Sequence, residues 1–282
     1  METIRIPRIM QETSKGHLLK SRTIGLIPTM GALHEGHLSL VMRAKDENDI
    51  VTASIFVNPI QFGPGEDFES YPRDSDSDME KLEKAGVHIL FMPDIKSIYP
   101  EGFSTSVNVS GISERLCGAF RPGHFAGVAT VVCKLFHLVK PTRAYFGQKD
   151  FQQTVIVSRM VRDLNIDVDM IVCPIVRERD GLAMSSRNAY LGPEERSAAA
   201  VIYKTLQAVS KMIKSGEAAP SDIKRSLETM LKDERLVSEL QYAGVYDTRT
   251  LEELTEYKKE NLLAIALRVG KTRLIDNLIV EL

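Results

Sequence analysis

Two histidines three positions apart, His34 and His37, carry the strongest chemical signal in the sequence. They lie in the segment 28–37 (PTMGALHEGH), which follows an apolar strand-like run and opens a helix-like run. Because residues three apart on a helical turn share a face, both imidazoles can reach one ligand. A helix start offers free N–H groups and a positive dipole end, and Gly36 lets a ligand approach the backbone. The segment therefore predicts a phosphate-binding site.

Two other interpretations of the histidine pair stay open. A His-x-x-His pair can bind a metal ion, but the metalloprotease pattern needs a spacing of four. No further histidine or carboxylate cluster nearby supplies an obvious third ligand, so no metal-ligating residue is predicted. The pair could instead be two solvated loop histidines.

A second polar segment, 146–153 (FGQKDFQQ), joins a short strand-like run to another helix-like run. Lys149 can place a point charge on a phosphate. Asp150 lies at a helix start, so its carboxylate either caps the backbone or accepts hydrogen bonds from ribose hydroxyls. Gln153 follows one turn later on the same face, where a solvated surface position is the simpler interpretation of that residue alone.

Two further segments are weak signals when each is taken by itself. In 56–62 (FVNPIQF), just past a buried strand-like run, Asn58 and Gln61 offer donors and acceptors for hydroxyls and a carboxylate, or form an ordinary proline turn. In 184–188 (MSSRN), two hydroxyls and an arginine form a donor-rich loop of the kind that clamps a phosphoryl group.

Apolar, β-branched runs alternate with helix-like patterns over residues 23–176. Strands are predicted at 23–28, 50–57, 87–91, 144–146 and 168–176, and helices at 36–48, 74–85, 128–139 and 151–165. This alternation implies βαβ units and an α/β fold with a doubly wound parallel sheet. Ligands of such sheets bind at the carboxyl ends of the strands, where three of the four polar segments fall.

The pattern changes after residue 187. Two helices, at 193–215 and 219–232, precede three strand-like runs at 240–246, 262–269 and 272–280, the last two joined by a hairpin turn at 270–271. We therefore expect a nucleotide- and substrate-binding domain at 1–185 and a smaller C-terminal α+β lid domain at 186–282.

Composition narrows the class of protein. The chain has 282 residues, 43% of them hydrophobic, and a net charge of −2, which points to neither a nucleic-acid nor a membrane partner. Its three cysteines are odd in number and far apart, which argues against a disulfide framework. The amino-terminal segment lacks an apolar signal core, and a cytoplasmic location is expected.

The order and combination of these segments resemble the pantothenate synthetase family along nearly the whole chain. The histidine segment resembles the HIGH-type signature of the nucleotidyltransferases, and 184–188 takes the place of their KMSKS loop. The segments 71–73 (YPR), 121–125 (RPGHF) and 273–277 (RLIDN) match the family as well.

The resemblance implies a Rossmann-like sheet domain and a two-step ligation. ATP activates the carboxylate of pantoate as pantoyl adenylate with release of pyrophosphate. The amine of β-alanine then displaces AMP and forms pantothenate. Magnesium on the nucleotide phosphates and a homodimer formed through the N-terminal domain are also implied.

The resemblance also implies residue roles. The catalytic groups would be His34, His37, Lys149, Ser185, Ser186 and Arg187. ATP would be bound by these six together with Met30, Gly147, Asp150 and Met184. Pantoate would be bound by Met30, Asn58, Gln61 and Gln153.

One position departs from the family pattern, in which a glutamate occurs just before the RPGHF segment. Here Cys117 stands at that place, and we expect this loop at a subunit contact rather than in the chemistry. Two alternative functions are compatible with parts of this pattern: an adenylyl or cytidylyl transferase on the same fold, and a non-catalytic nucleotide-binding protein. The two glutamines disfavour the first, and the presence of the histidines, Lys149 and Arg187 disfavours the second.

Overall fold

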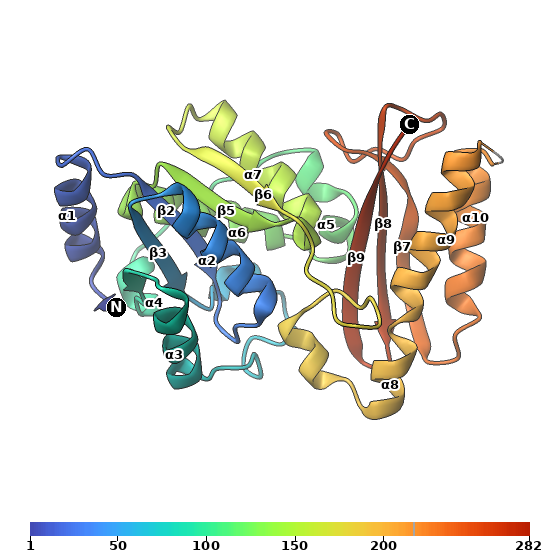
Figure 1. The fold of residues 1–282 in the computed structure, drawn as a ribbon, viewed down its shortest axis with the longest axis horizontal. Helices are drawn as coiled ribbons and strands as arrows, with labels where there is room; N and C mark the ends of the chain where they lie inside the picture. Colours follow the sequence, from blue (N-terminus) through green and yellow to red (C-terminus); the bar gives the residue numbers. More distant parts are fainter. Residues whose placement is uncertain (217) are drawn as a thin grey trace.

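Two sheets of different type form the framework of the molecule (Figure 1). The structure is a computed structural model and describes residues 1–216 and 218–282. Six parallel strands form the first sheet in the order β1-β4-β3-β2-β5-β6. Their bounds are β1 (Glu2–Ile4), β2 (Ile24–Thr29), β3 (Ile50–Ile55), β4 (Ile89–Phe91), β5 (Arg143–Gly147) and β6 (Asp169–Cys173).

Helices cover both faces of this sheet because its central strands are apolar on both sides. On β2, Leu26 packs into the core with residues of α6 and α7, while Ile27 packs into the core with α2 and α3. The helices of this part are α1 (Pro7–Leu18), α2 (Glu35–Glu47), α3 (Ser75–Ala85), α4 (Ile95–Ile98), α5 (Cys117–Phe120), α6 (His124–Val139) and α7 (Phe151–Asp163). The predicted Rossmann-like doubly wound sheet is confirmed.

The second sheet is antiparallel, in the order β7-β8-β9, and lies between the first sheet and the helices α9 and α10 (Figure 1). Its elements are α8 (Pro193–Ala198), α9 (Val201–Ser215), α10 (Pro220–Lys232), β7 (Val237–Asp247), β8 (Glu260–Val269) and β9 (Thr272–Glu281). Alternate residues of β8 face opposite sides: Leu263 packs with the helices, and Leu262 joins the core of the first sheet. The two parts therefore share buried apolar contacts.

One predicted helix, 193–215, is wrong in its extent. The structure divides it into α8 and α9, because around Ala199 and Ala200 bonds to the residue three positions back replace the α-helical spacing. The alanine-rich sequence gives no sign of this break. The first strand and helix, β1 and α1, were not predicted.

The loop after β2 is held by a buried carboxylate from α3. Asp78 accepts hydrogen bonds from the backbone N–H groups of Ala32 (2.7 Å) and Leu33 (2.8 Å). Ala32 has a φ of 52°, a left-handed conformation that a residue with a side chain adopts only when its surroundings impose it. A Cβ on Gly31 would lie 2.9 Å from the Asp78 carboxylate. Asp78 thereby fixes the backbone just before the histidine pair.

Replacing Asp78 by alanine is expected to lower the free energy of unfolding by about 3 kcal/mol, because two backbone N–H groups lose a charged acceptor. Urea denaturation of the purified variant measures this. Asp76→Ala, at an exposed position of the same helix, is the control and should change stability by less than about 0.5 kcal/mol. Equal stability of Asp78→Ala and the control would contradict the assigned role.

Candidate active site

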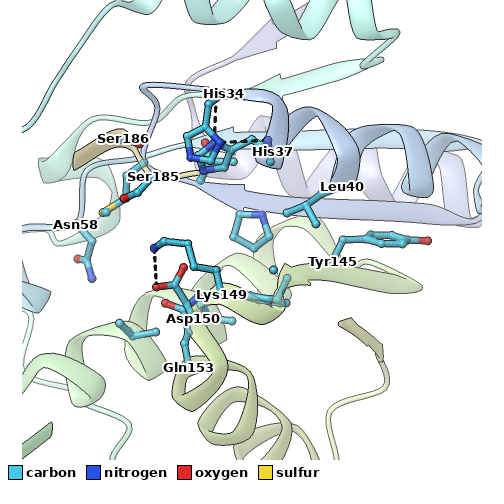
Figure 2. A pocket seen from close by; sticks show the side chains of 18 of the residues that line it. His34, His37, Leu40, Asn58, Tyr145, Lys149, Asp150, Gln153, Ser185 and Ser186 are labelled. Atoms are coloured by element: carbon cyan, nitrogen blue, oxygen red, sulfur yellow. Dashed lines mark hydrogen bonds and ion pairs between the residues drawn. The ribbon is translucent and has the colours of Figure 1, made fainter. Parts of the chain in front are cut away.

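A cavity of about 220 Å³ opens at the carboxyl ends of the parallel strands. It lies where the strand order reverses, at β2 between its parallel neighbours β3 and β5, as expected for a ligand site in this fold. It contains every residue that the sequence proposed for ATP and substrate: Met30, His34, His37, Asn58, Gln61, Gly147, Lys149, Asp150, Gln153, Met184, Ser185, Ser186 and Arg187. Figure 2 shows the histidines on one side of it and Lys149, Asp150 and Gln153 on the other.

The two histidines lie at the first turn of α2, with ring centroids 4.1 Å apart. Nδ1 of His34 accepts the N–H of Gly36 (3.1 Å), and Nδ1 of His37 accepts the N–H of His34 (3.3 Å). A neutral ring whose Nδ1 is an acceptor carries its proton on Nε2. Each histidine therefore presents an N–H donor at its other ring nitrogen.

Both rings are neutral at ordinary pH. Burial and the nearby Lys149 ammonium lower the pKa of His34 to about 4. Burial and the neighbouring His34 ring lower the pKa of His37 to about 3. The two rings are thus suited to donate hydrogen bonds to a phosphate and not to neutralise its charge.

Gly36 has a second use beyond access to the backbone. A Cβ at this position would lie 2.8 Å from Cε1 of His34 and 2.9 Å from its Nδ1. The His34 ring can fold back onto the start of α2 only because residue 36 has no side chain.

Lys149 and Asp150 lie on η3 (Gln148–Asp150), between the end of β5 and the start of α7. Nζ of Lys149 is 3.6 Å from Oδ1 of Asp150. Burial acts to raise the pKa of Asp150, but Lys149 and Arg187 hold it below its usual value. Neighbouring Gly147 faces open space, since a Cβ there would meet nothing within 4 Å. This side of the cavity thus offers a cation, a carboxylate and free room.

Asn58 precedes η1 (Pro59–Gln61), which follows β3, and Gln61 is its last residue. Nδ2 of Asn58 donates to Oε1 of Gln61 (3.0 Å) and to the carbonyl of Gly127 (3.1 Å), and Oδ1 accepts from Tyr99 (2.8 Å). The Asn58 amide is therefore used within the protein and holds Gln61. Among the described residues the Gln153 amide has no hydrogen-bond partner, which leaves it available to a ligand.

The 184–188 loop enters η4 (Ser186–Tyr190) and contacts the histidine loop directly. Oγ of Ser186 donates to the carbonyl of Ala32 (3.0 Å), and Oγ of Ser185 accepts from the N–H of Arg187 (3.3 Å). Met184 lies beside Gly36. This loop therefore closes the cavity on the side of α2.

Two adjacent acids, Glu66 and Asp67, were not predicted from the sequence. Asp67 binds Arg187 through two hydrogen bonds of 2.9 and 2.8 Å, and Glu66 binds Arg121 through two of 2.6 Å. Both arginines line the cavity. The acids stand in a Gly- and Pro-containing segment, where a sequence pattern indicates only a solvated loop.

His124, in the RPGHF segment, links Arg121 to the glutamine turn. Its Nδ1 lies 2.8 Å from the carbonyl of Gln61, which can only accept, so Nδ1 carries the proton. Nε2 lies 3.0 Å from Nη1 of Arg121 and accepts from it. Burial and the Arg121 guanidinium lower the pKa of His124 to about 4. The ring is therefore a neutral connector.

Comparison with known proteins gives one consistent result. The model of the pantoate-beta-alanine ligase family matches residues 2–279. Pantothenate synthetase of Thermodesulfovibrio yellowstonii is 63% identical over 281 residues, covering all of both chains, and that of Thermotoga petrophila is 52% identical over 99% of each.

Solved structures agree with this result. Pantothenate synthetase of Thermus thermophilus superposes with a TM-score of 0.95 at 45% identity over the full length of both chains. The pantoate-beta-alanine ligase of Francisella tularensis, solved in complex with β-γ ATP and β-alanine, has a TM-score of 0.81 at 35% identity, covering 99% of this chain and 97% of that one.

The lowered pKa values of His34, His37 and His124 predict that acid destabilises the protein. Between about pH 4 and the usual histidine value near 6.5, the unfolded chain binds more protons, so the free energy of unfolding falls as pH decreases through this window. His124→Gln should reduce the slope by up to about 1.4 kcal/mol per pH unit, measured by denaturation at several pH values.

His137→Gln is the matched control for this measurement, since that histidine lies on the same helix with an exposed ring. The slope in His124→Gln should be smaller than the slope in this control. An unchanged slope in His124→Gln would contradict the assignment of a buried neutral ring.

Proposed function

The chain belongs to the pantoate-beta-alanine ligase family, and we propose that its cavity at the end of the parallel sheet carries out the family reaction: the ATP-dependent condensation of pantoate with β-alanine to pantothenate, AMP and pyrophosphate. The observation that carries the proposal is the convergence in one cavity of the α2 histidines, Lys149, the Ser185–Arg187 loop and two glutamines. Phosphate-binding donors thus lie beside groups suited to a polar carboxylic acid.

The first step forms the bond between a carboxylate oxygen of pantoate and the α-phosphorus of ATP, while the bond to pyrophosphate breaks. The second step forms a bond between the β-alanine nitrogen and the acyl carbon; AMP leaves with the electron pair, and the amine loses a proton. No protein nucleophile is needed, so the chain contributes positioning and charge stabilisation.

The donors around α2 hold the triphosphate. His34 and His37 donate from Nε2 to phosphate oxygens at a helix start whose N–H groups favour anions. Lys149, Ser185, Ser186 and Arg187 bind further phosphate oxygens and stabilise the charge that develops as pyrophosphate leaves. Asp67 engages Nε and Nη2 of Arg187, so Nη1 can donate to a phosphate oxygen while Asp67 stays bound.

Pantoate and the nucleoside contact the remaining residues that line the cavity. Gln61 and Gln153 hold the hydroxyls and carboxylate of pantoate against Met30, and Asn58 fixes Gln61 from behind. Gly147 leaves space for the ribose, Asp150 accepts from its hydroxyls, and Met184 packs on the nucleotide.

Magnesium fits this arrangement as a companion of the nucleotide. Among residues 1–216 and 218–282, no group of three or more acids, histidines or cysteines is placed to hold a metal ion, and Asp150 is the one acidic side chain that lines the cavity. The phosphates and water would therefore supply most of its ligands, as Mg²⁺ tolerates well, and the ion would offset the phosphate charge.

The proposal also covers the oligomeric state, the location and the role of the second domain. The protein acts as a homodimer in the cytoplasm, with residues 186–282 as a lid domain over the site of residues 1–185. Within the described part of the chain, no helix is long and apolar enough to cross a membrane.

Incubation with ATP, magnesium and pantoate should give pantoyl adenylate and pyrophosphate, and addition of β-alanine should give pantothenate and AMP, both identified by mass spectrometry. Folded, ATP-binding protein that forms no pantoate-dependent product would reject the substrate. A product that retains the nucleotide would indicate a transferase instead.

His37→Ala and Lys149→Ala should lower the rate of adenylate formation by about 100-fold or more, because each removes a donor aimed at developing charge. Rapid-quench measurement without β-alanine isolates this step. A normal rate in either variant would remove that residue from the mechanism.

Gly127→Ala should raise the KM for pantoate by about 10-fold or more with little change for ATP. A Cβ on this α6 residue would lie 2.5 Å from the carbonyl of Ile60 and 2.7 Å from Cα of Gln61, so η1 has to move. Steady-state kinetics with each substrate varied gives both values. Gly123→Ala, where a Cβ meets nothing within 4 Å, controls for strain in the segment, although its φ of 82° adds a cost of its own. Equal effects on both substrates would contradict the prediction.

A further inference from the structure

A buried amide on the second sheet reaches across to the segment that carries Lys149. Asn277 on β9 is 3% exposed. Its Nδ2 donates to the backbone carbonyls of Gln148 and Lys149, both at 3.0 Å, and its Oδ1 accepts from Nε2 of Gln148 at 3.2 Å. All three hydrogen bonds of this side chain therefore go to two consecutive residues of the nucleotide-binding part.

The position of Asn277 is itself fixed by its neighbour on the strand. Successive side chains of β9 point to opposite faces, so Asp276 lies on the helix side of the sheet. There Arg177 binds the Asp276 carboxylate through both guanidinium Nη atoms, and its Nη2 also donates to the carbonyl of Asn277 (3.3 Å). The Arg177 guanidinium rests 3.9 Å from the ring centroid of Tyr203 on α9. Asn277 thus projects from an anchored strand.

Packing alone does not hold the Lys149 segment. A second cavity of about 80 Å³ borders it, lined among others by Lys149, Phe151 and Asn277. Within the described residues, no side chain caps the start of η3 or of α7 by a hydrogen bond. Since the segment borders a cavity and has no side-chain cap, the hydrogen bonds from Asn277 act directly on its backbone.

We propose that Asn277 is a positioning residue. From the second sheet it fixes the backbone of Lys149, and it thereby directs the Lys149 ammonium group toward the phosphates. The inference rests on the proposed role of Lys149 in the first step. A lysine side chain has a flexible four-carbon stem, so its amine is placed accurately only if its backbone is. Displacement of a catalytic group by about 1 Å can cost about 100-fold in rate.

The test uses Asn277→Ala and Asn277→Leu; the second keeps the number and branching of the side-chain heavy atoms but cannot form the hydrogen bonds. In both, adenylate formation measured by rapid quench should fall about 10- to 100-fold, while the KM for pantoate changes by less than about 3-fold. In a Lys149→Ala background, Asn277→Ala should add less than about 3-fold, because the group it positions is already gone.

Asn261→Ala is the matched control. Asn261 is a fully buried amide of the same sheet that also makes three hydrogen bonds, but all of them stay within the second part of the chain, to Lys258 and Val280. This variant should lower stability yet leave the rate of the folded enzyme unchanged.

Three results would overturn the inference: a normal rate in Asn277→Leu, full additivity of Asn277→Ala with Lys149→Ala, or an equal loss of rate in Asn261→Ala. A normal rate in Lys149→Ala is a different result, since it would remove the proposed role of Lys149 and leave nothing for Asn277 to position. The measurements therefore separate failure of this inference from failure of the proposed function.

Discussion

A site that binds a polyanion gathers positive charges, and the protein has to fold with these charges close together before the anion is bound. The rest of the structure depends on how this repulsion is offset. Three cations, Lys149, Arg121 and Arg187, line one cavity together with the positive end of α2. Unpaired, they would repel one another in a partly dry space. Carboxylates from Glu66 and Asp67 occupy the two arginines, and Asp150 lies near the lysine. The protein therefore balances these cations with its own carboxylates before a ligand is bound.

Neutral histidines are the second part of this solution. Two further cations beside Lys149 would raise the cost of burying charge in the cavity, and burial instead keeps His34 and His37 uncharged. Their backbone hydrogen bonds hold the rings in one tautomer. The site thus combines charged groups on flexible side chains with neutral hydrogen-bond donors held in place at the start of α2.

The sequence predicts the sheet well because strands buried on both faces are continuously apolar, as in β3. It misses β1, which has only three residues, and α1, whose buried side chains are only Met10 and Ser14. The polar residues that follow the strands could be predicted to lie in one site, because the carboxyl ends of parallel strands lie at the same edge of the sheet. By contrast, Asp67 and Arg187 are 120 positions apart, and Asn277 and Lys149 are 128 apart. No local pattern relates such pairs; only the fold does.

The tautomers of the two histidines have a consequence for where protons go. Amide formation releases one proton from the attacking amine. Nε2 of each ring is already protonated, and each Nδ1 lone pair is engaged by a backbone N–H at the start of α2. Neither ring is a ready base, so the proposed reaction requires another acceptor for this proton. The two imidazoles at the start of α2 are therefore set to donate hydrogen bonds and not to take up the proton of the amine.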